Sequence, residues 1–389
     1  NYIKCNINND GCVIARSAEA KALGVPMGAP LFKMKNLIRQ HGIIVKSSNF
    51  ALYGDLSSRI VSILAGFAPR LEVYSIDESF LDLTGVRDIT EHCRTIQETV
   101  IQWTGVPVSV GVGPTKTLAK LANRLAKKER HPVVLSTPDE WESALKATEI
   151  GDVWGIGYRR TPMLIERGIR TAFDLTTVSE GWIRQKMGIT GLRTAKELKG
   201  HACSDLEVDQ IDKKTVCVSR SFGKTITDRA TLAEAVATFA DIAGSKIRNA
   251  GLSAGRIVIF IESDRFQPDQ PQYRNSAGMD YRPPCGSDLA IHKAAKVCLE
   301  RIYRDGIGYK RAGIYLLDLV KADEGIGDLF ASESPKSLIV SGVTDRLNAR
   351  FGSGTIALGR VRRERTWYMR QEARSPHYTT RWTDIPVCR

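Results

Sequence analysis

The chain has 389 residues, 42% of them hydrophobic, which is enough for two to four domains with their own cores and excludes an intrinsically disordered chain. Its formal net charge of +13 indicates a polyanionic partner, either nucleic acid or an anionic membrane surface. The apolar runs are too short to cross a bilayer, and the eight scattered cysteines show no zinc-binding spacing, so we expect a cytoplasmic protein with reduced thiols.

The first fifty residues or so predict a small unit of mixed α and β structure. A turn signal at Asn9–Gly11 precedes a short strand over 12–15 and a helical stretch over 17–23. A second helix is expected over 52–67.

The stretch YSIDESFLDLT places two adjacent carboxylates, Asp77 and Glu78, in a turn between two short strand-like runs. Carboxylate oxygens bind Mg²⁺, and a pair of such ions can neutralise both oxygens of an in-line displacement at phosphorus. The flanking Ile76 and Phe80 favour a packed turn. A metal site for phosphoryl chemistry is the functional hypothesis, and a solvated surface turn is the alternative.

A helix over 89–103 is followed by a strand over 106–112 and a helix over 115–128. Strands alternating with helices make this first third α/β or α+β. The last helix has a leucine face and a basic face, the latter formed by Lys116, Lys120, Arg124, Lys127 and Lys128. Taken alone, such a basic stripe is more often a solvated helix face.

The sequence DVWGIGYRR, followed by a helical stretch to Arg167, is typical of a helix-hairpin-helix. Its glycines, Gly155 and Gly157, would leave backbone N–H groups free to hold a nucleic-acid phosphate without reading bases. An ordinary helix-connecting turn explains the pattern equally well. The polar stretch 204–214 is a plausible linker.

A separate α/β domain is predicted beyond the linker. Its expected elements are strands over 215–225, 256–262 and 313–320 and helices over 232–250 and 288–303. The tail over 360–381 has seven arginines and two acids, interleaved with Trp367, Tyr368, His377 and Tyr378. This composition is typical of nucleic-acid or partner contacts, and a solubilising tail is the alternative.

Taken together and in this order, the motifs resemble the Y-family of translesion DNA polymerases, in particular the UmuC type. The matching segments are NNDGCVIARSAEAKALGVPMG, YSIDESFLDLTGV, VGVGPTKTLAKLANRLAKK, VWGIGYRR, SRSFGKTIT and SPHYTTRWTD. The resemblance implies an α+β multidomain fold with a right-hand arrangement: fingers over 1–50, palm over 51–136, a helical thumb with the helix-hairpin-helix over 137–210, an α/β little finger over 215–322, and a clamp-binding-like segment with a basic extension over 323–389.

The resemblance also implies roles for particular residues. Asp77 and Glu78 correspond to catalytic, metal-binding carboxylates, and Lys21 and Lys127 to nucleotide-binding positions. In other branches an arginine stands at position 21, so lysine keeps the charge but loses the bidentate fork. The DNA-binding positions are Gly155, Gly157 and Arg220. Leu329 and Phe330 match a degenerate clamp-binding peptide, in which Ile326 replaces the usual amide.

The implied activity is error-prone translesion synthesis in the SOS response to DNA damage, by two-metal phosphoryl transfer with Mg²⁺ as cofactor. The implied partners are primer-template DNA, deoxynucleoside triphosphates, a processed accessory subunit of the UmuD′ type, a recombinase filament and, weakly, the sliding clamp. No membrane partner is expected.

One family motif has no counterpart in this sequence. The first palm strand, of the form DxNxFYASC, supplies a further metal-binding aspartate, whereas NYIKCNI runs straight into NNDGC and Asp10 corresponds to a turn residue. We therefore expect the chain as given to bind DNA but extend primers little. The alternative function is a catalytically dead relative that binds DNA and partner proteins. A helix-hairpin-helix DNA glycosylase with Asp174 as catalytic acid is a third interpretation, which leaves YSIDESF unexplained.

Overall fold

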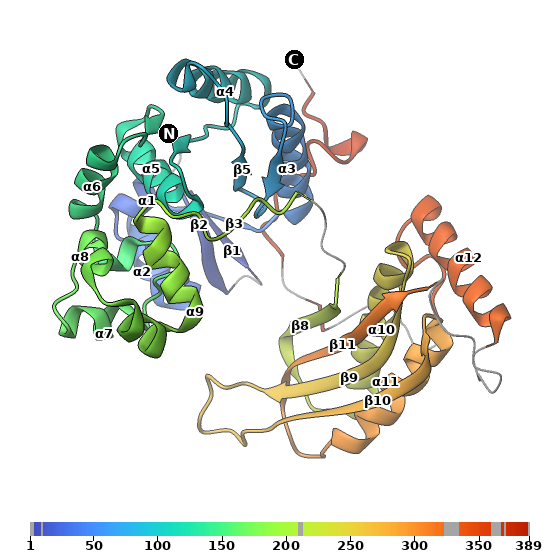
Figure 1. Ribbon diagram of the computed structural model, residues 1–389. Coiled ribbons are helices and arrows are strands. Elements are labelled where there is room, and N and C mark those ends of the chain that lie inside the picture. The colour runs from blue at the N-terminus through green and yellow to red at the C-terminus, as the bar shows by residue number, and fades with distance from the viewer. Residues whose placement is uncertain are drawn as a thin grey trace. The chain divides into compact units, whose positions relative to one another are not determined.

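The structure is a computed structural model that describes residues 4–8, 11–208, 213–322, 334–358, 367–368 and 371–387 (Figure 1). The chain forms two compact units. The first unit comprises residues 1–48 with 212–375, and the second comprises residues 49–211 with 376–389.

A three-stranded sheet carries the N-terminal part of the first unit. Its middle strand β1 (Lys4–Asn8) pairs antiparallel with β2 (Cys12–Arg16) and parallel with β3 (Ile44–Ser47). Helix α1 (Ala18–Ala22) begins after Ser17, whose hydroxyl accepts a hydrogen bond from the Ala20 N–H as an N-cap. The predicted strand and helix of this region are therefore present.

The remaining elements of this part are a 3₁₀ turn η1 (Leu31–Met34) and helix α2 (Lys35–Gln40). Buried Val13, Ala20 and Ile43 give it a small apolar core.

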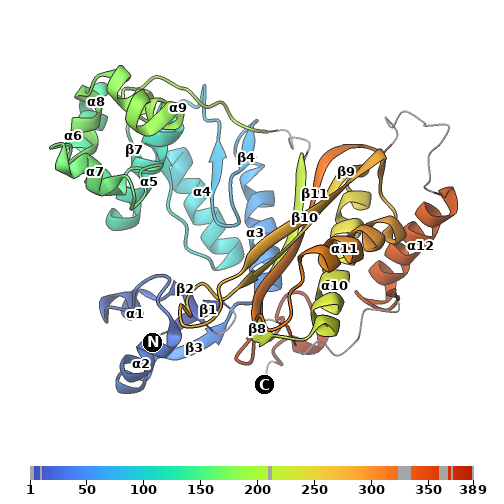
Figure 2. The same cartoon turned by 90° about the horizontal axis from the view of Figure 1, so that it is seen from below.

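A four-stranded antiparallel sheet, in the order β10-β9-β11-β8, forms the larger part of the first unit. Helices α10 and α11 cover one face of it (Figures 1 and 2). The elements are β8 (Thr215–Ile226), α10 (Arg229–Asn249), β9 (Leu252–Ser263), β10 (Arg274–Cys285), α11 (Asp288–Ile302) and β11 (Tyr309–Lys321).

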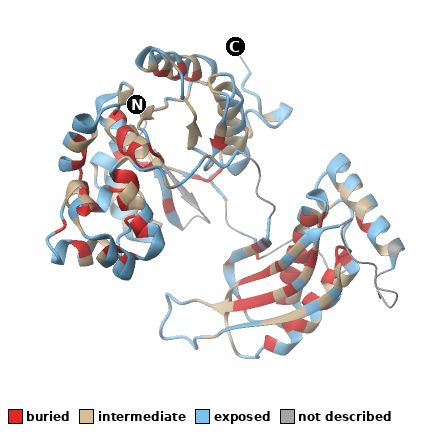
Figure 3. Ribbon diagram, in the orientation of Figure 1, coloured by how far each residue is buried: buried red, intermediate tan, exposed pale blue. Residues whose placement is uncertain are grey.

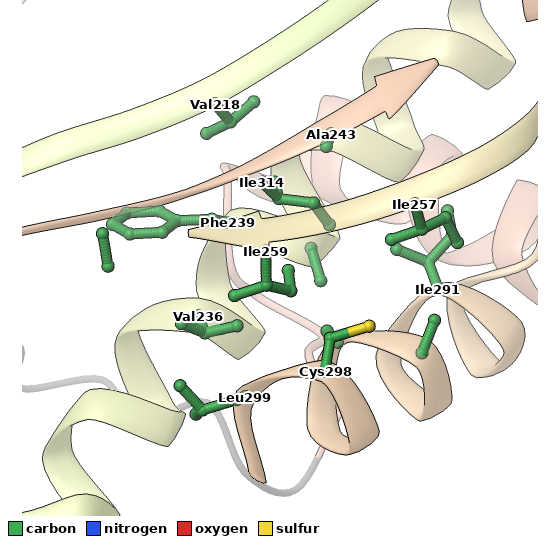
Figure 4. Close-up of a cluster of buried hydrophobic side chains, with 14 of the residues drawn as sticks. Val218, Val236, Phe239, Ala243, Ile257, Ile259, Ile291, Cys298, Leu299 and Ile314 are labelled. Atoms are coloured by element: carbon green, nitrogen blue, oxygen red, sulfur yellow. The ribbon is translucent and has the colours of Figure 1, made fainter. Parts of the chain in front are cut away.

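Side-chain periodicity explains the packing of these two layers. In β9, Ile257, Ile259 and Ile261 alternate along the strand and all are fully buried, because every second side chain of a strand points to the same face. From the opposite layer, α10 contributes Val236 and Phe239 (Figure 4). The buried positions gather between the sheet and its two helices (Figure 3).

Two elements in the part of this unit that holds the four-stranded sheet were not predicted. Strand β10 reads RNSAGMDYRPPC, which lacks apolar alternation and has two prolines just before its last residue. Both features are tolerated because β10 is an edge strand. Helix α12 (Pro335–Phe351) is held to the unit through polar contacts. The Arg248 guanidinium donates to Asp345 at 2.7 and 2.9 Å and to Asp288 at 2.7 Å.

The tail contributes to the core of the first unit at one described position. Trp367 is only 2% exposed, and its ring contacts the rings of Phe222 and Phe239 at centroid distances of 6.0 and 5.4 Å. The interpretation of the tail aromatics as outward contacts is wrong for Trp367, because its indole fills the core. Farther along, Ala373 exchanges hydrogen bonds with Ser47 at the end of β3.

The second unit combines short strands with many helices. Its strands are β4 (Leu71–Val73), β5 (Ser79–Leu81), β6 (Gly111–Val112) and β7 (Val133–Val134). Its helices are α3 (Phe50–Leu64), α4 (Ile89–Thr104), α5 (Lys116–Glu129), α6 (Pro138–Lys146), α7 (Thr161–Glu166), α8 (Ala172–Thr177) and α9 (Glu180–Leu198), with 3₁₀ turns η2 (Ile150–Asp152) and η3 (Trp382–Asp384). The strand expected over 106–112 is limited to β6, since Pro107 has no N–H for a ladder.

Helix α5 is the central element of this unit. Thr115 caps its start by accepting a hydrogen bond from the Leu118 N–H at 3.2 Å. The apolar face, with Leu118, Leu121 and Ala122 buried, packs into the core that α6–α9 share. The basic face of the same helix is therefore turned away from this core. In the part of the chain that the structure describes, no helix is long and apolar enough to span a membrane.

Candidate functional site

The two predicted carboxylates lie at the tip of the β4–β5 hairpin. The Tyr74 and Ser75 N–H groups both donate to the Glu78 carbonyl, at 3.1 and 3.0 Å, and close the turn. The Ser75 hydroxyl donates to Asp77 Oδ1 at 2.7 Å, which orients that carboxylate. Asp77 is exposed and the Glu78 side chain is 35% exposed. Ile76 is 53% exposed, so the expectation that it packs the turn is wrong.

The basic face of α5 lies against this hairpin and is not simply solvated. Lys116 forms an ion pair of 2.5 Å with Glu72, the β4 residue paired with Phe80. One helical turn later, Lys120 pairs with Glu78, also at 2.5 Å. The spacing of four residues places both lysines on one side of the helix, facing the carboxylates. The solvated-face interpretation is wrong for these two lysines.

An aromatic cluster packs the tip of the hairpin where Ile76 does not. The Tyr74 ring contacts the Phe80 and Trp154 rings, each at a centroid distance of 5.6 Å. Trp154 belongs to the loop after η2, and Arg124 of α5 forms an ion pair with Asp152, the last residue of η2. The cluster and this ion pair tie the hairpin tip, α5 and the loop together.

A pocket of about 240 Å³ opens between these elements. Its polar lining includes Glu78, Lys120, Asn123, Arg124, Lys127 and Asp152. Among the described residues, Lys127 forms an ion pair with no carboxylate and is exposed at the pocket wall. Of the two predicted carboxylates, Glu78 lines the pocket and Asp77 does not. Several cationic side chains beside the Glu78 carboxylate suit a phosphate chain together with a divalent cation.

The predicted helix-hairpin-helix turn follows Trp154 directly. Gly155 has φ of +88°, a conformation that other residues adopt only with strain. Val153 and Ile156 are buried and anchor the turn, whereas Gly155 and Gly157 are exposed. The N–H groups of both glycines form no hydrogen bond with any described residue. They are therefore available to an anion, as the functional interpretation requires.

The remaining predicted residues belong to the first unit or lie outside the described residues. Lys21 is exposed in α1, and Arg220 is exposed in β8, where its guanidinium donates to the Ser219 carbonyl at 2.8 Å. Both belong to the first unit, whereas the carboxylates belong to the second. Leu329 and Phe330 lie outside the described residues.

Asp77 and Glu78 provide the oxygen donors that Mg²⁺ prefers. Within the described ranges, His, Cys, Asp and Glu side chains form no group of three or more that could hold a metal. Mg²⁺ is usually held by one or two carboxylates, with substrate phosphates and waters completing the octahedron. Two adjacent carboxylates beside a cationic pocket fit an ion of this kind.

Asp174 has a structural role that argues against a glycosylase. Its carboxylate accepts hydrogen bonds from the Arg170 and Thr171 N–H groups at 2.9 and 2.8 Å, in a capping box at the start of α8. These bonds, with that from Thr171 the strongest, lower the pKa of Asp174, so the group stays ionised. A carboxylate bonded in this way is unsuited to act as a general acid.

Comparison with known proteins identifies the family. Residues 3–124 match the impB/mucB/samB family, residues 213–329 match the impB/mucB/samB family C-terminal domain, and residues 340–388 match a domain of unknown function (DUF4113). Protein UmuC of Salmonella typhimurium (strain LT2) is 40% identical over 387 residues, which cover 97% of this chain and 92% of that relative. The chain belongs to the impB/mucB/samB family, the UmuC type of Y-family polymerases.

Other members and solved structures agree with this family assignment. Protein ImpB of Salmonella typhimurium is 36% identical, over 98% of this chain and 92% of that relative. A solved Y-family DNA polymerase chimera of Dbh and Dpo4 matches with a TM-score of 0.63 at 21% identity, covering 82% of this chain and 92% of that chain. The predicted α+β multidomain polymerase fold is confirmed.

Sequence reasoning did not assign three side chains to this site: Tyr74, Trp154 and Lys120, the last of which was named only as part of the basic face of its helix. Lys120 carried a usable signal, because it lies seven residues before Lys127 and therefore on the same helix face. Trp154 carried none, since its contact with the hairpin depends on how the loop after η2 folds back onto α5.

Proposed function

We propose that this protein is the catalytic subunit of an error-prone translesion DNA polymerase that adds deoxynucleotides to a primer opposite a damaged template. Membership of the UmuC type makes this the expected activity. The observation that carries the proposal is the pocket in which Glu78 lies beside Lys120, Arg124 and Lys127.

The catalytic roles follow from the chemistry of these side chains. Asp77 and Glu78 would hold Mg²⁺, in a two-metal scheme of which they supply two carboxylates. When bound, the metal neutralises charge that develops on the phosphoryl oxygens. Lys127, exposed and without a carboxylate partner in the described part, would bind the incoming triphosphate. Lys21 would add a second cation from the fingers, over residues 1–50.

DNA would be held through its phosphates. In the proposed thumb, over 137–210, the exposed N–H groups of Gly155 and Gly157 would grip the backbone without reading bases. In the proposed little finger, over 215–322, Arg220 would contact the template strand. The proposed palm extends over 51–136. Such contacts tolerate damaged bases, because they depend on phosphates and not on base edges.

The biological setting and further partners are part of the same proposal. We assign the protein to the SOS response to DNA damage in the cytoplasm, with a processed accessory subunit of the UmuD′ type and a recombinase filament as partners. Weak contact with the sliding clamp is assigned to Leu329 and Phe330, in the segment over 323–389.

Primer extension tests the proposal. Asp77→Asn should lower the rate of Mg²⁺-dependent extension by about a hundredfold or more, because a metal ligand is worth several kcal/mol of transition-state stabilisation. Affinity for primer-template DNA, measured by fluorescence anisotropy, should not change. Asp139→Asn, at an exposed position of α6, is the matched control and should extend normally. Equal rates for the two variants would refute the assignment of Asp77.

A second candidate function is DNA binding without catalysis. The ion pair between Glu78 and Lys120 favours it, because one of the two carboxylates already has a counter-ion. Wild-type protein that binds primer-template DNA tightly and extends no primer at any Mg²⁺ concentration would support this second function.

A further inference from the structure

Lys120 is enclosed more completely than a surface lysine. Its Nζ lies 2.5 Å from Glu78 Oε1, and its side chain is only 18% exposed. The same Nζ lies 5.5 Å from the centroid of the Tyr74 ring and 5.8 Å from that of Trp154. Two ring faces and one carboxylate therefore surround the ammonium group, with little screening by salt.

The neighbouring ion pair shows by contrast what is distinctive about Lys120. In the pair formed by Lys116 and Glu72, both side chains are at most 10% exposed. Glu72 also accepts from the Glu207 N–H at 2.9 Å, and Lys116 donates to the Asp205 carbonyl at 2.6 Å. That pair is closed off by further hydrogen bonds and is structural.

Among the described residues, no further hydrogen bond closes off the pair formed by Lys120 and Glu78. The Glu78 side chain is 35% exposed, and both residues line the pocket. A divalent cation arriving in the pocket can reach the Glu78 carboxylate, but only in competition with the ammonium group that already neutralises it.

We propose that Lys120 is a positioning residue that acts as the built-in counter-ion of Glu78, and that metal loading displaces it while Tyr74 and Trp154 retain it at the pocket wall. The inference rests on the proposed function, since it concerns the same carboxylates. Before the metal arrives, Lys120 holds Glu78 in place. Afterwards it leaves an additional positive charge beside Lys127, where phosphates would lie.

Metal affinity without DNA or nucleotide tests the competition. Free Mn²⁺ is measured by electron paramagnetic resonance during titration of the full chain. Lys120→Met should bind Mn²⁺ roughly fivefold more tightly or better, because the competing pair is gone. Unchanged or weaker binding would overturn the proposal.

A charge-matched control distinguishes the effect of losing the ion pair with Glu78 from the effect of lowering the positive charge of the pocket. Lys127→Met removes one positive charge from the same pocket without removing a partner of Glu78. It should tighten Mn²⁺ binding clearly less than Lys120→Met does. Equal tightening in both variants would mean that only net charge matters, and the proposal would be wrong. Unchanged thermal unfolding midpoints establish that both variants fold.

Tryptophan emission tests the aromatic part of the proposal. A Mg²⁺ titration should change the emission of the wild-type protein, because the ammonium group near Trp154 loses its carboxylate. Trp154→Phe should remove this change, which assigns it among the six tryptophans of the chain. Lys120→Met should remove it too, since no ammonium group is left to respond. An emission change that persists in Lys120→Met would contradict the proposal that the rings of Tyr74 and Trp154 retain the Lys120 ammonium group.

The outcomes separate this inference from the proposed function. Equally tight Mn²⁺ binding by the wild type and by Lys120→Met refutes only the inference, and Asp77→Asn still tests catalysis. Tightened binding in Lys120→Met with no primer extension by the wild type refutes only the polymerase activity. If neither the wild type nor Lys120→Met binds Mn²⁺, the inference fails, and primer extension still decides the proposed function.

Discussion

The β8–β11 sheet and the β4–β5 hairpin are stabilised by different means. The sheet has strands of 12 or 13 residues and a continuous apolar layer beneath two long helices. The hairpin has strands of three residues and is fixed to α5 by ion pairs and aromatic rings. In the proposed scheme the sheet region only supports DNA contacts and can rely on packing. A site that admits charged ligands must keep polar groups in place without burying them completely.

Removing a buried side chain from the core of the sheet region should have the largest effect on the free energy of unfolding. Phe239→Ala should lower the free energy of unfolding by about 3–5 kcal/mol, because the ring is 1% exposed and leaves a cavity among the residues of the two layers. Denaturant unfolding measures this loss. Phe266→Ala, at a 79% exposed position, is the matched control and should change stability by less than about 0.5 kcal/mol. A similar loss in both variants would contradict the packing argument.

A buried carboxylate should matter next, in the second unit. Glu197 is 2% exposed, and it accepts hydrogen bonds from the Thr117 N–H at 3.0 Å and the Cys203 N–H at 3.3 Å. Glu197→Ala should cost about 2–3 kcal/mol, because these buried donors lose their acceptor at the start of α5.

The control for this prediction lies on the same helix. Glu180 forms a half-exposed ion pair with Lys196 at 3.0 Å, so Glu180→Ala should cost no more than about 1 kcal/mol in the same urea titration. If Glu197→Ala cost no more stability than Glu180→Ala, the buried hydrogen bonds to Glu197 would not be what positions α5.

Changing the backbone conformation of the helix-hairpin-helix turn at Gly155 should have a smaller effect on stability but a measurable effect on DNA binding. Gly155→Ala should cost about 1–2 kcal/mol, because φ is +88° and a Cβ would lie 3.2 Å from Thr194 Oγ1. If the turn holds one phosphate, the logarithmic salt slope of DNA binding should become shallower by about one.

The matched control for the turn is Gly181→Ala. Gly181 lies in α9 with open space around its Cβ position and needs no positive φ, so this variant should bind DNA with the wild-type salt slope. An unchanged slope in Gly155→Ala, with the fold intact, would favour an ordinary helix-connecting turn.

The same comparison shows what could be predicted from the sequence. Strand β9 and helix α10 follow from apolar periodicity, because one buried face is repeated over many residues. The tip of the hairpin follows from the two short strand-like runs on either side of Asp77 and Glu78, and the family resemblance added the roles of these residues. Strand β10 was missed because an edge strand needs no apolar alternation. The role of Trp367 was predicted wrongly because an aromatic residue among arginines shows no apolar periodicity that would point to a core.

The contacts within the site could not be predicted from the sequence for a related reason. The pairing of Lys120 with Glu78 joins residues 42 positions apart in the sequence, and Trp154 approaches them from another loop. Residue type and spacing showed which groups carry charge. The fold of the second unit decided which of them meet, because short polar elements have no periodicity that specifies their partners.

The smallest predicted effect concerns Asp174, whose lowered pKa comes mainly from the hydrogen bond donated by the Thr171 N–H. Asp174→Asn should cost about 1 kcal/mol or less at neutral pH, because the capping box loses a charged acceptor. A carboxylate with a lowered pKa in the folded state stabilises the fold above its ordinary value of 3.8 and loses this contribution as the pH falls further. The difference between variant and wild type in urea unfolding should therefore stay constant from neutral to weakly acidic pH and shrink only below that value. A difference that grows on acidification would contradict the capping role.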